Sequence, residues 1–318
     1  MLPSVFEATL ARAVEFRDLA AVHLDIGATM SFCGLGEGML NHELPAYVAG
    51  ASAAGFEPRM CSNGSLLNEA RASALLDAGL REIFINCGDL DDDYDRVYKV
   101  PFGRMRDNVV RFMELAGDRC EVHIVLVDHQ QDRARVSRIR DYWRGLGVTH
   151  FFNSPMLNRA GTLDVAGMDY DTYPERPLAE AMFERLGIQP VCAAAFAFPF
   201  IGYDGNYYLC SSDWEKQVAV GNVFEDSFLS ILRTKLAHVE SRAPICQACC
   251  HDPINHMTTA IRAKALGDPH AEDVRVLAAI FAARTRATYE LVAAADAHID
   301  ALTPASSYRR ERIPVMVI

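Results

Sequence analysis

Four cysteines in the second half of the chain constrain its fold more than any other feature. They are Cys192, Cys210, Cys246 and Cys249, and the last two form a Cys-x-x-Cys pair. A Cys-x-x-Cys turn presents two sulfurs to one metal centre, and two distant cysteines can complete the set. Four thiolates fill the coordination shell of one zinc ion or of one iron–sulfur cluster. The fold is therefore expected to bring these positions together.

The residues before Cys210 predict how this cysteine is placed. The segment from Gly202 to Leu209 reads Gly-Tyr-Asp-Gly-Asn-Tyr-Tyr-Leu, which is typical of a β-hairpin with an Asp-Gly turn. Cys210 follows directly, so the hairpin is expected to carry this cysteine at its end.

Composition narrows the class of protein. The chain has 318 residues, half of them apolar, which allows one large domain or a domain of roughly 200 residues with an appended module. A net charge of −11 argues against nucleic acid as a partner, because phosphate binding relies on clustered Lys and Arg. The longest apolar stretch, residues 191–203, contains Pro199 and is too short for a membrane span. Nine cysteines and no visible export signal predict a reducing, cytoplasmic location and no membrane partner.

The first half of the chain alternates between extended apolar runs and helical segments after an initial helix, which predicts a parallel sheet with helical crossovers. Strands are expected near Val22–Leu24 continuing to Met30–Cys33, and at Glu57–Cys61, Glu82–Cys87, Glu121–Val127 and Thr149–Asn153. Helices are expected at Glu43–Ala54, Asn68–Ala78, Phe102–Leu115 and Asp132–Leu146. A first strand preceded by a helix without its own strand predicts an α/β fold: a partial, TIM-like (β/α)6 barrel that lacks its first strand.

The chain divides into four expected segments. These are the partial barrel at 1–165, a linker with Pro174 and Pro177 at 166–190, the cysteine-rich hairpin module at 191–257 and a helical C-terminal extension at 258–318.

Several motifs resemble those of radical SAM enzymes with a SPASM/twitch extension. The cysteine module resembles that extension in its hairpin, its cysteine spacing as far as Cys249, and the following Val-Gly-Asn-Val (220–223) and Asp-Ser (226–227). Gly-Leu-Gly-Glu-Gly (34–38) is similar to the family's Gly-Gly-Glu-Pro loop, and Ser-Asn-Gly (62–64) to its Thr-Asn-Gly. Asn-Arg-Ala-Gly (158–161) is similar to an Asn-Arg-x-Gly loop of SPASM members. Strand-end loops of this kind form the active face of parallel sheets.

The resemblance implies an enzyme that uses S-adenosylmethionine (SAM) and [4Fe–4S] clusters to abstract hydrogen from a peptide or a small natural-product or sugar-type substrate. It also implies a reductase of the flavodoxin or ferredoxin type as electron donor. The implied SAM contacts are Gly36, Glu37, Ser62, Asn63, Asn86 and Arg159. The implied ligands of a single auxiliary [4Fe–4S] cluster are Cys192, Cys210, Cys246 and Cys249. The sequence assigns no catalytic acid or base.

The family's Cys-x3-Cys-x2-Cys loop, which holds the catalytic cluster, does not occur in the sequence. Either the natural protein begins further upstream, or the chain is a non-catalytic relative or partner subunit with a structural or electron-transfer metal site. We favour the first interpretation, because the SAM-side motifs are retained. Zinc is the alternative to an auxiliary cluster at the four cysteines.

Cys33, Cys61 and Cys87 each end one of three successive expected strands. Parallel neighbours lie about 4.8 Å apart, so the three thiols would form an unconventional metal site if they faced one another. Free cysteine packs well in protein cores, and we favour three small buried apolar side chains instead. Cys250 and His251 are alternative ligands for the metal of the cysteine module.

Overall fold

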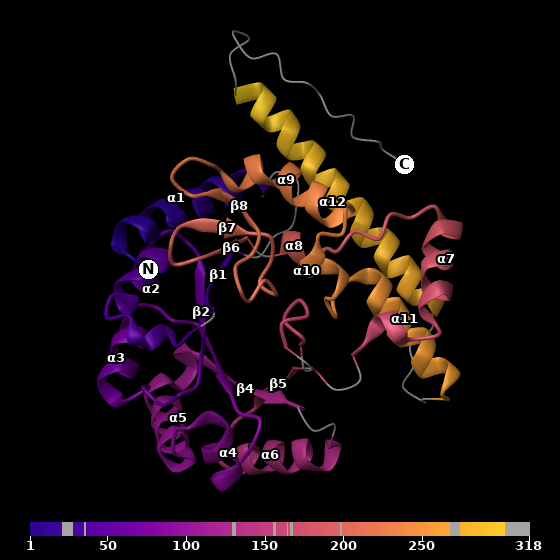
Figure 1. The fold of residues 1–318 in the computed structure, drawn as a ribbon. Helices are drawn as coiled ribbons and strands as arrows, with labels where there is room; N and C mark the ends of the chain where they lie inside the picture. Colours follow the sequence, from indigo (N-terminus) through magenta and orange to yellow (C-terminus); the bar gives the residue numbers. More distant parts are fainter. Residues whose placement is uncertain are drawn as a thin grey trace. The chain divides into compact units, whose positions relative to one another are not determined.

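The computed structural model describes residues 1–20, 28–34, 36–128, 132–154, 157–163, 165, 168–197, 199–267 and 274–302 (Figure 1). Contacts divide the chain into two compact units. Unit 1 combines Met1 and Pro3–Leu10 with Leu24–Met156, and unit 2 combines Leu2 and Ala11–His23 with Leu157–Ile318. The four segments 1–165, 166–190, 191–257 and 258–318 stay predictions.

Unit 1 is built on a five-stranded parallel sheet with the order β1-β2-β3-β4-β5. The strands are β1 (Thr29–Phe32), β2 (Glu57–Ser62), β3 (Glu82–Asn86), β4 (Glu121–Val127) and β5 (His150–Ser154). Sequential order with parallel pairing is the arrangement that helical crossovers produce. The expected strands are confirmed to within one residue at each end, and the expected extension at Val22–Leu24 lies outside the described residues.

The helices of unit 1 also follow the expected pattern to within one residue. They are the first part of α1 (Pro3–Ala20), α2 (Leu44–Ala53), α3 (Glu69–Asp77), α5 (Phe102–Ala116) and α6 (Arg133–Gly145), with short 3₁₀ turns η1 (Gly38–Leu40) and η2 (Gly117–Arg119). Helix α4 (Asp91–Tyr98) was not expected, because Asp is a poor helix former. Its Tyr94 is fully buried, so tertiary packing stabilises this helix against its local preference.

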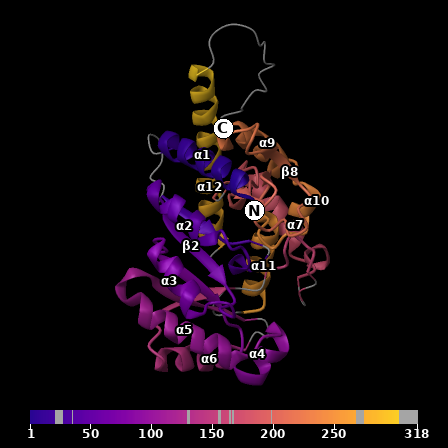
Figure 2. The ribbon, with the colours of Figure 1, turned by 90° about the vertical axis from the view of Figure 1, so that its left-hand side faces the viewer.

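The two faces of the sheet in unit 1 carry different side chains. Met60, Ile83 and Ile124 are fully buried and belong to the same apolar core as residues of α2, α3, α5 and α6. Figure 2 shows these four helices one after another on the side turned to the viewer. Side chains alternate along a strand, so the neighbouring positions point to the opposite face. There Cys61, Phe84, His123 and His150 occupy paired positions across β2, β3, β4 and β5.

Unit 2 contains the expected hairpin. Strands β6 (Phe200–Ile201), β7 (Asn206–Tyr208) and β8 (Ala219–Asn222) form an antiparallel sheet in that order. The Asp204 carboxylate accepts hydrogen bonds from the Asn206 N–H at 3.2 Å and the Tyr208 hydroxyl at 2.7 Å. This local bonding closes the Asp-Gly turn, and Cys210 lies two residues after β7, as expected.

The rest of the described part of unit 2 is helical. Its elements are the second part of α1, η3 (Tyr170–Thr172), α7 (Arg176–Leu186), α8 (Ala194–Ala197), α9 (Phe228–Glu240), α10 (Pro244–Gln247), α11 (Pro253–Ala265) and α12 (Val274–Leu302). Helix α7 lies in the segment expected to be a linker, and its Phe183 shares a buried core with Met257 and Phe281. Helix α12 confirms the expected helical extension as far as Leu302. Among the helices described, none is long and apolar enough to cross a membrane.

Candidate metal centre

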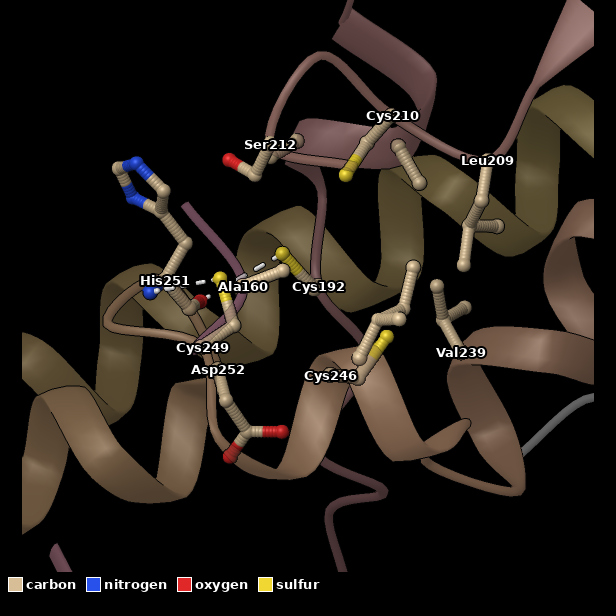
Figure 3. Close-up of a pocket in the computed structure, with 13 residues that line it drawn as sticks. Ala160, Cys192, Leu209, Cys210, Ser212, Val239, Cys246, Cys249, His251 and Asp252 are labelled. Atoms are coloured by element: carbon tan, nitrogen blue, oxygen red, sulfur yellow. Dashed lines mark hydrogen bonds between the residues drawn. The ribbon is translucent and has the colours of Figure 1, made fainter. Parts of the chain in front are cut away.

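The four cysteines of the second half of the chain line one pocket in unit 2 (Figure 3), which we call the four-cysteine pocket. Cys192 precedes α8, Cys210 follows β7, Cys246 lies in α10 and Cys249 lies in the turn after α10. In Figure 3 Cys210 enters the pocket from above and Cys246 from below. The pocket has an empty volume of about 370 Å³, part of it open to solvent. The structure thus brings the expected positions together, and their role as metal ligands stays a prediction.

The walls of the pocket are largely apolar. Its other lining residues are Ala160, Ala194, Ala195, Leu209, Ser212, Val239, Ile245, His251 and Asp252. Burial in these surroundings raises the pKa of Cys192 to about 11 and that of Cys246 to about 12, and it also raises the pKa of Cys210. These thiols therefore stay protonated at neutral pH unless a cation is bound. A metal centre would supply the positive charge that makes them thiolates.

Backbone N–H groups point at three of the four sulfurs. The His251 N–H donates to Cys249 Sγ at 3.4 Å. The N–H groups of Ala194 and Ala195 donate to Cys192, and each of these bonds lowers the pKa against the larger effect of burial. Ser212 and Asp213 donate to Cys210 in the same way. Such donors stabilise thiolate sulfur and are among the groups that tune iron–sulfur clusters.

The arrangement of the four thiols bears on which group they could hold. In the described part of the chain, no group of three or more His, Cys, Asp or Glu side chains could hold a single ion. A zinc ion with Zn–S bonds of about 2.3 Å requires its sulfurs to lie roughly 4 Å apart. An iron–sulfur cluster distributes its thiolates over separate irons, so it accepts a wider set of ligands. The four-thiolate donor set fits an iron–sulfur cluster, and zinc stays the alternative.

Cys250 and Cys249 differ although they are adjacent. Cys250 does not line the pocket, and its N–H donates to Asn158 Oδ1 at 3.0 Å. A hydrogen bond from the Cys249 thiol to Cys250 raises the pKa of Cys249 and lowers that of Cys250. Of the two alternative ligands, His251 lies at the pocket and Cys250 does not.

Two buried carboxamides hold the Cys-x-x-Cys turn. Asn158 Nδ2 donates to Ala248 O at 2.6 Å, so this side chain binds the turn through both its oxygen and its nitrogen. Asn255, which is fully buried, donates to Gln247 O at 2.8 Å and to Cys249 O at 3.0 Å. Main-chain groups that would otherwise be buried without partners are thereby satisfied.

Gly161 makes the close approach of the 158–161 loop to this turn feasible. Its φ is +83°, and an added Cβ would lie 2.6 Å from Ala248 Cβ. Only glycine takes this conformation without strain and leaves this space. The Asn-Arg-Ala-Gly motif therefore supports the four-cysteine pocket, a role that the sequence did not reveal.

Lys235 is a further residue that sequence reasoning missed. It lies in α9, its side chain is fully buried, and Nζ donates to Ala195 O at 2.8 Å. Burial lowers its pKa to about 8, and the nearby Cys210 acts in the opposite direction. A buried lysine needs a compensating negative charge, which four thiolates would provide. The one sequence signal for its burial was the position of Lys235 on the otherwise apolar face of a helix.

The strand ends of unit 1 bring together three of the predicted SAM contacts. The Glu37 carboxylate accepts hydrogen bonds from Ser62 Oγ at 3.0 Å, Asn63 N–H at 2.9 Å and Met39 N–H at 3.2 Å. Gly36 directly precedes Glu37 in the same loop. The Asn63 side chain accepts from the N–H and hydroxyl of Ser65, so it closes the turn after β2. The two loops are thus joined by one carboxylate.

The other two predicted SAM contacts lie on other elements. Asn86 is the half-buried last residue of β3. Arg159 lies in unit 2, with its guanidinium carbon 5.4 Å from the centre of the Trp214 ring. All the SAM contacts stay predictions.

Of the three strand-end cysteines, Cys33, Cys61 and Cys87, only Cys87 is buried as the sequence analysis favoured. Cys87 is buried, accepts a hydrogen bond from Trp143 Nε1 at 3.2 Å and donates to Asp89 O. Cys33 is exposed and Cys61 half-buried, and their sulfurs lie 2.6 Å apart. The favoured interpretation of three buried apolar side chains is wrong for this pair, because both side chains point away from the helix-covered core.

Comparison with known proteins gives a family match for the cysteine-rich part of the chain. The sequence model of the SPASM family, described as an iron–sulfur cluster-binding domain, matches residues 192–252. This range contains all four cysteines of the pocket. A search of the curated proteins found no match.

Solved structures match most of the chain at low identity. Streptococcus suis SuiB bound to precursor peptide SuiA is 13% identical with a TM-score of 0.54, and the match covers 80% of this chain and 66% of SuiB. The enzyme anSMEcpe with bound AdoMet and Cp18Cys peptide is 13% identical with a TM-score of 0.51, and covers 75% and 74%. BtrN in complex with AdoMet and 2-DOIA is 15% identical with a TM-score of 0.46, and covers 78% and 80%. The chain has the α/β fold of TIM-barrel-like radical SAM structures, with a five-stranded parallel sheet and a small antiparallel sheet.

Proposed function

We propose that this chain acts as a radical SAM/SPASM-type enzyme that uses SAM and [4Fe–4S] clusters to abstract hydrogen from a substrate. The observation that carries the proposal is the convergence of Cys192, Cys210, Cys246 and Cys249 on one pocket within the residues that match the SPASM domain. The proposed substrate is a peptide or a small natural-product or sugar-type molecule. The peptides bound to SuiB and anSMEcpe support peptides as one candidate class.

The pocket would hold an auxiliary cluster through its four thiolates. When bound, such a cluster supplies electron transfer, because all four irons carry protein ligands and none is open to substrate. The chain's own residues prepare the site: N–H groups of residues 194, 195, 212, 213 and 251 face the sulfurs. Lys235 provides a buried positive charge, and the apolar walls limit water.

The proposed SAM site lies at the strand ends of unit 1. Glu37 is held by three donors and therefore fixes the glycine loop against the Ser62-Asn63 turn. A rigid pair of loops presents backbone groups to a ligand at little entropic cost. Asn86 and Arg159 are proposed as further contacts, and a flavodoxin- or ferredoxin-type reductase as electron donor.

A second candidate is a non-catalytic relative or partner subunit with a structural or electron-transfer site. It is favoured by one observation, the absence of Cys-x3-Cys-x2-Cys from the 318 residues. The two candidates are distinguished by SAM binding and by the formation of 5′-deoxyadenosine under reducing conditions. The radical SAM enzyme requires both from the natural protein.

The first experiment is the iron, sulfide and zinc content after anaerobic purification and reconstitution. We expect about four irons and matching sulfide per chain. One zinc with no iron would overturn the cluster assignment in favour of a structural metal site. Isothermal titration with SAM then tests the strand-end site, with Glu37→Gln as the variant that weakens its hydrogen bonds. Equal SAM affinity of parent and variant would contradict the proposed role of Glu37.

A further inference from the structure

Cys33 and Cys61, which we call the cysteine pair, meet at the edge of the parallel sheet. Phe32, the last residue of β1, is paired with Met60 of β2. The residues that follow them, Cys33 and Cys61, therefore lie side by side. The two sulfurs are 2.6 Å apart. At this separation the two thiols are in direct contact and hydrogen-bonded. Parallel neighbours also have a Cα separation that a disulfide accepts.

The surroundings of the pair favour redox chemistry over packing. Cys33 is exposed, so a small oxidant has access to it. A hydrogen bond from the Cys33 thiol lowers the pKa of Cys61, and the charge of Arg59 acts in the same direction. Cys61 thus supplies the stabilised thiolate, and Cys33 the exposed thiol, whose own pKa the same hydrogen bond raises. Two other thiols of unit 1 differ: Cys87 and Cys120 are buried, and burial raises the pKa of each to about 12.

We infer that Cys33 and Cys61 form a reversible disulfide, a redox-sensitive link between the ends of β1 and β2. With glutathione disulfide as oxidant, one thiolate of the pair attacks a glutathione sulfur and releases one glutathione thiolate. The second cysteine then attacks the mixed disulfide, forms the Cys33–Cys61 bond and releases the second glutathione. The two protein thiols lose two electrons and two protons, and one glutathione disulfide becomes two thiols.

The link acts on the loops that follow each cysteine. Cys33 directly precedes the loop that carries Glu37, and Cys61 directly precedes Ser62 and Asn63, which donate to that carboxylate. The reduced protein joins the two loops by hydrogen bonds, and the oxidised protein adds a covalent bond at their base. Oxidation therefore restricts the relative movement of these two loops.

The test uses the full chain after anaerobic cluster reconstitution. It is equilibrated in glutathione buffers from fully reduced to fully oxidised, quenched in acid, alkylated with N-ethylmaleimide, digested and examined by mass spectrometry. We expect a peptide linked through Cys33 and Cys61 to increase with the oxidised fraction and to disappear with dithiothreitol. The alkylated Cys87 and Cys120 peptides are expected to stay constant.

Two variants make the result specific. Cys33→Ser should abolish the link and leave Cys61 carrying a single glutathione, and Cys87→Ser should form the link as the parent does. Alkylation of both Cys33 and Cys61 at every buffer ratio would overturn the inference. Separate glutathione adducts on the two cysteines of the parent, without a linked peptide, would also overturn it.

Discussion

The two groups of cysteines in this chain are prepared for different chemistry. In the four-cysteine pocket of unit 2, Cys249 is buried and the other three thiols are half-buried, N–H donors face three of the sulfurs, and the buried Lys235 lies near Cys210. In the cysteine pair of unit 1, two thiols lie 2.6 Å apart with one of them exposed. The first arrangement sets four thiols around one pocket, and the second sets two thiols in direct contact.

This difference shows that spacing and surroundings decide what a thiol does. Burial raises the pKa of Cys192, Cys210 and Cys246, so a bound metal centre has to supply the charge. At the pair, the neighbouring thiol supports the thiolate, so no metal is required. Five predictions test whether the contrast holds, in order of decreasing expected effect.

Removal of the Cys-x-x-Cys ligands should eliminate the cluster. In Cys246→Ala/Cys249→Ala two of four ligands are lost, and we expect iron per chain after reconstitution to fall at least roughly tenfold. The matched control is Cys250→Ala, which removes a thiol that does not line the pocket. Equal iron loss in the control would assign Cys250 to the ligand set, and full iron in the double variant would refute the pocket as the cluster site.

Asn255→Ala should destabilise unit 2 strongly. It removes the donors to Gln247 O and Cys249 O in a buried site, so we expect the free energy of unfolding to fall by about 3 kcal/mol. Urea unfolding monitored by circular dichroism measures this change. Thr259→Ala, at an exposed position on the same helix, is the control and should change stability by less than about 0.5 kcal/mol. Similar losses in both variants would contradict the special role of the carboxamide.

Gly161→Ala should cost about 2 kcal/mol, because it combines a left-handed backbone with a clash against Ala248 Cβ. The double variant Gly161→Ala/Ala248→Gly relieves the clash and keeps the backbone strain. We therefore expect it to regain part of the lost stability in urea unfolding. A double variant less stable than Gly161→Ala would show that the contact with Ala248 is not the source of the cost.

Lys235→Met should lower the midpoint potential of the reconstituted cluster. A nearby positive charge favours the reduced, more negative cluster, and its loss corresponds to about 1 kcal/mol, roughly 45 mV for one electron. An EPR-monitored redox titration measures the shift. Lys264→Met removes an exposed charge that solvent screens, and it should leave the potential nearly unchanged. An unchanged potential in Lys235→Met would remove this lysine from the electrostatics of the pocket.

Arg59→Gln should reduce the reactivity of the cysteine pair. The Arg59 charge lowers the pKa of Cys61, so its loss raises that pKa and leaves less thiolate at pH 7. We expect iodoacetamide to react roughly threefold more slowly with the reduced pair at pH 7, and the difference to vanish at alkaline pH, where both proteins are ionised. Arg119→Gln, at an exposed pair with Asp77, is the control. A pH-independent decrease would point to altered access instead of altered ionisation.

Local patterns predicted much of this protein. The strands of unit 1 appear within one residue of their expected ends, because alternating burial and helical periodicity are properties of short segments. The Asp-Gly hairpin before Cys210 appears for the same reason, since its turn is closed by the side chain of Asp204. Helix α4 was not predicted from the sequence, because its first turn is rich in Asp, a poor helix former. The burial of Tyr94 stabilises it despite this local preference.

The order of the βα units, the hairpin and the four cysteines around the pocket could all be predicted from the sequence. Contacts between distant segments place Asn158, Gly161 and Asn255 against the Cys-x-x-Cys turn and bury Lys235 near Cys210. The tertiary structure also separated Cys87, which turns to Trp143, from Cys33 and Cys61, which turn to each other. The physical reason is that side-chain direction depends on strand pairing and on packing between segments tens of residues apart, which no local pattern records.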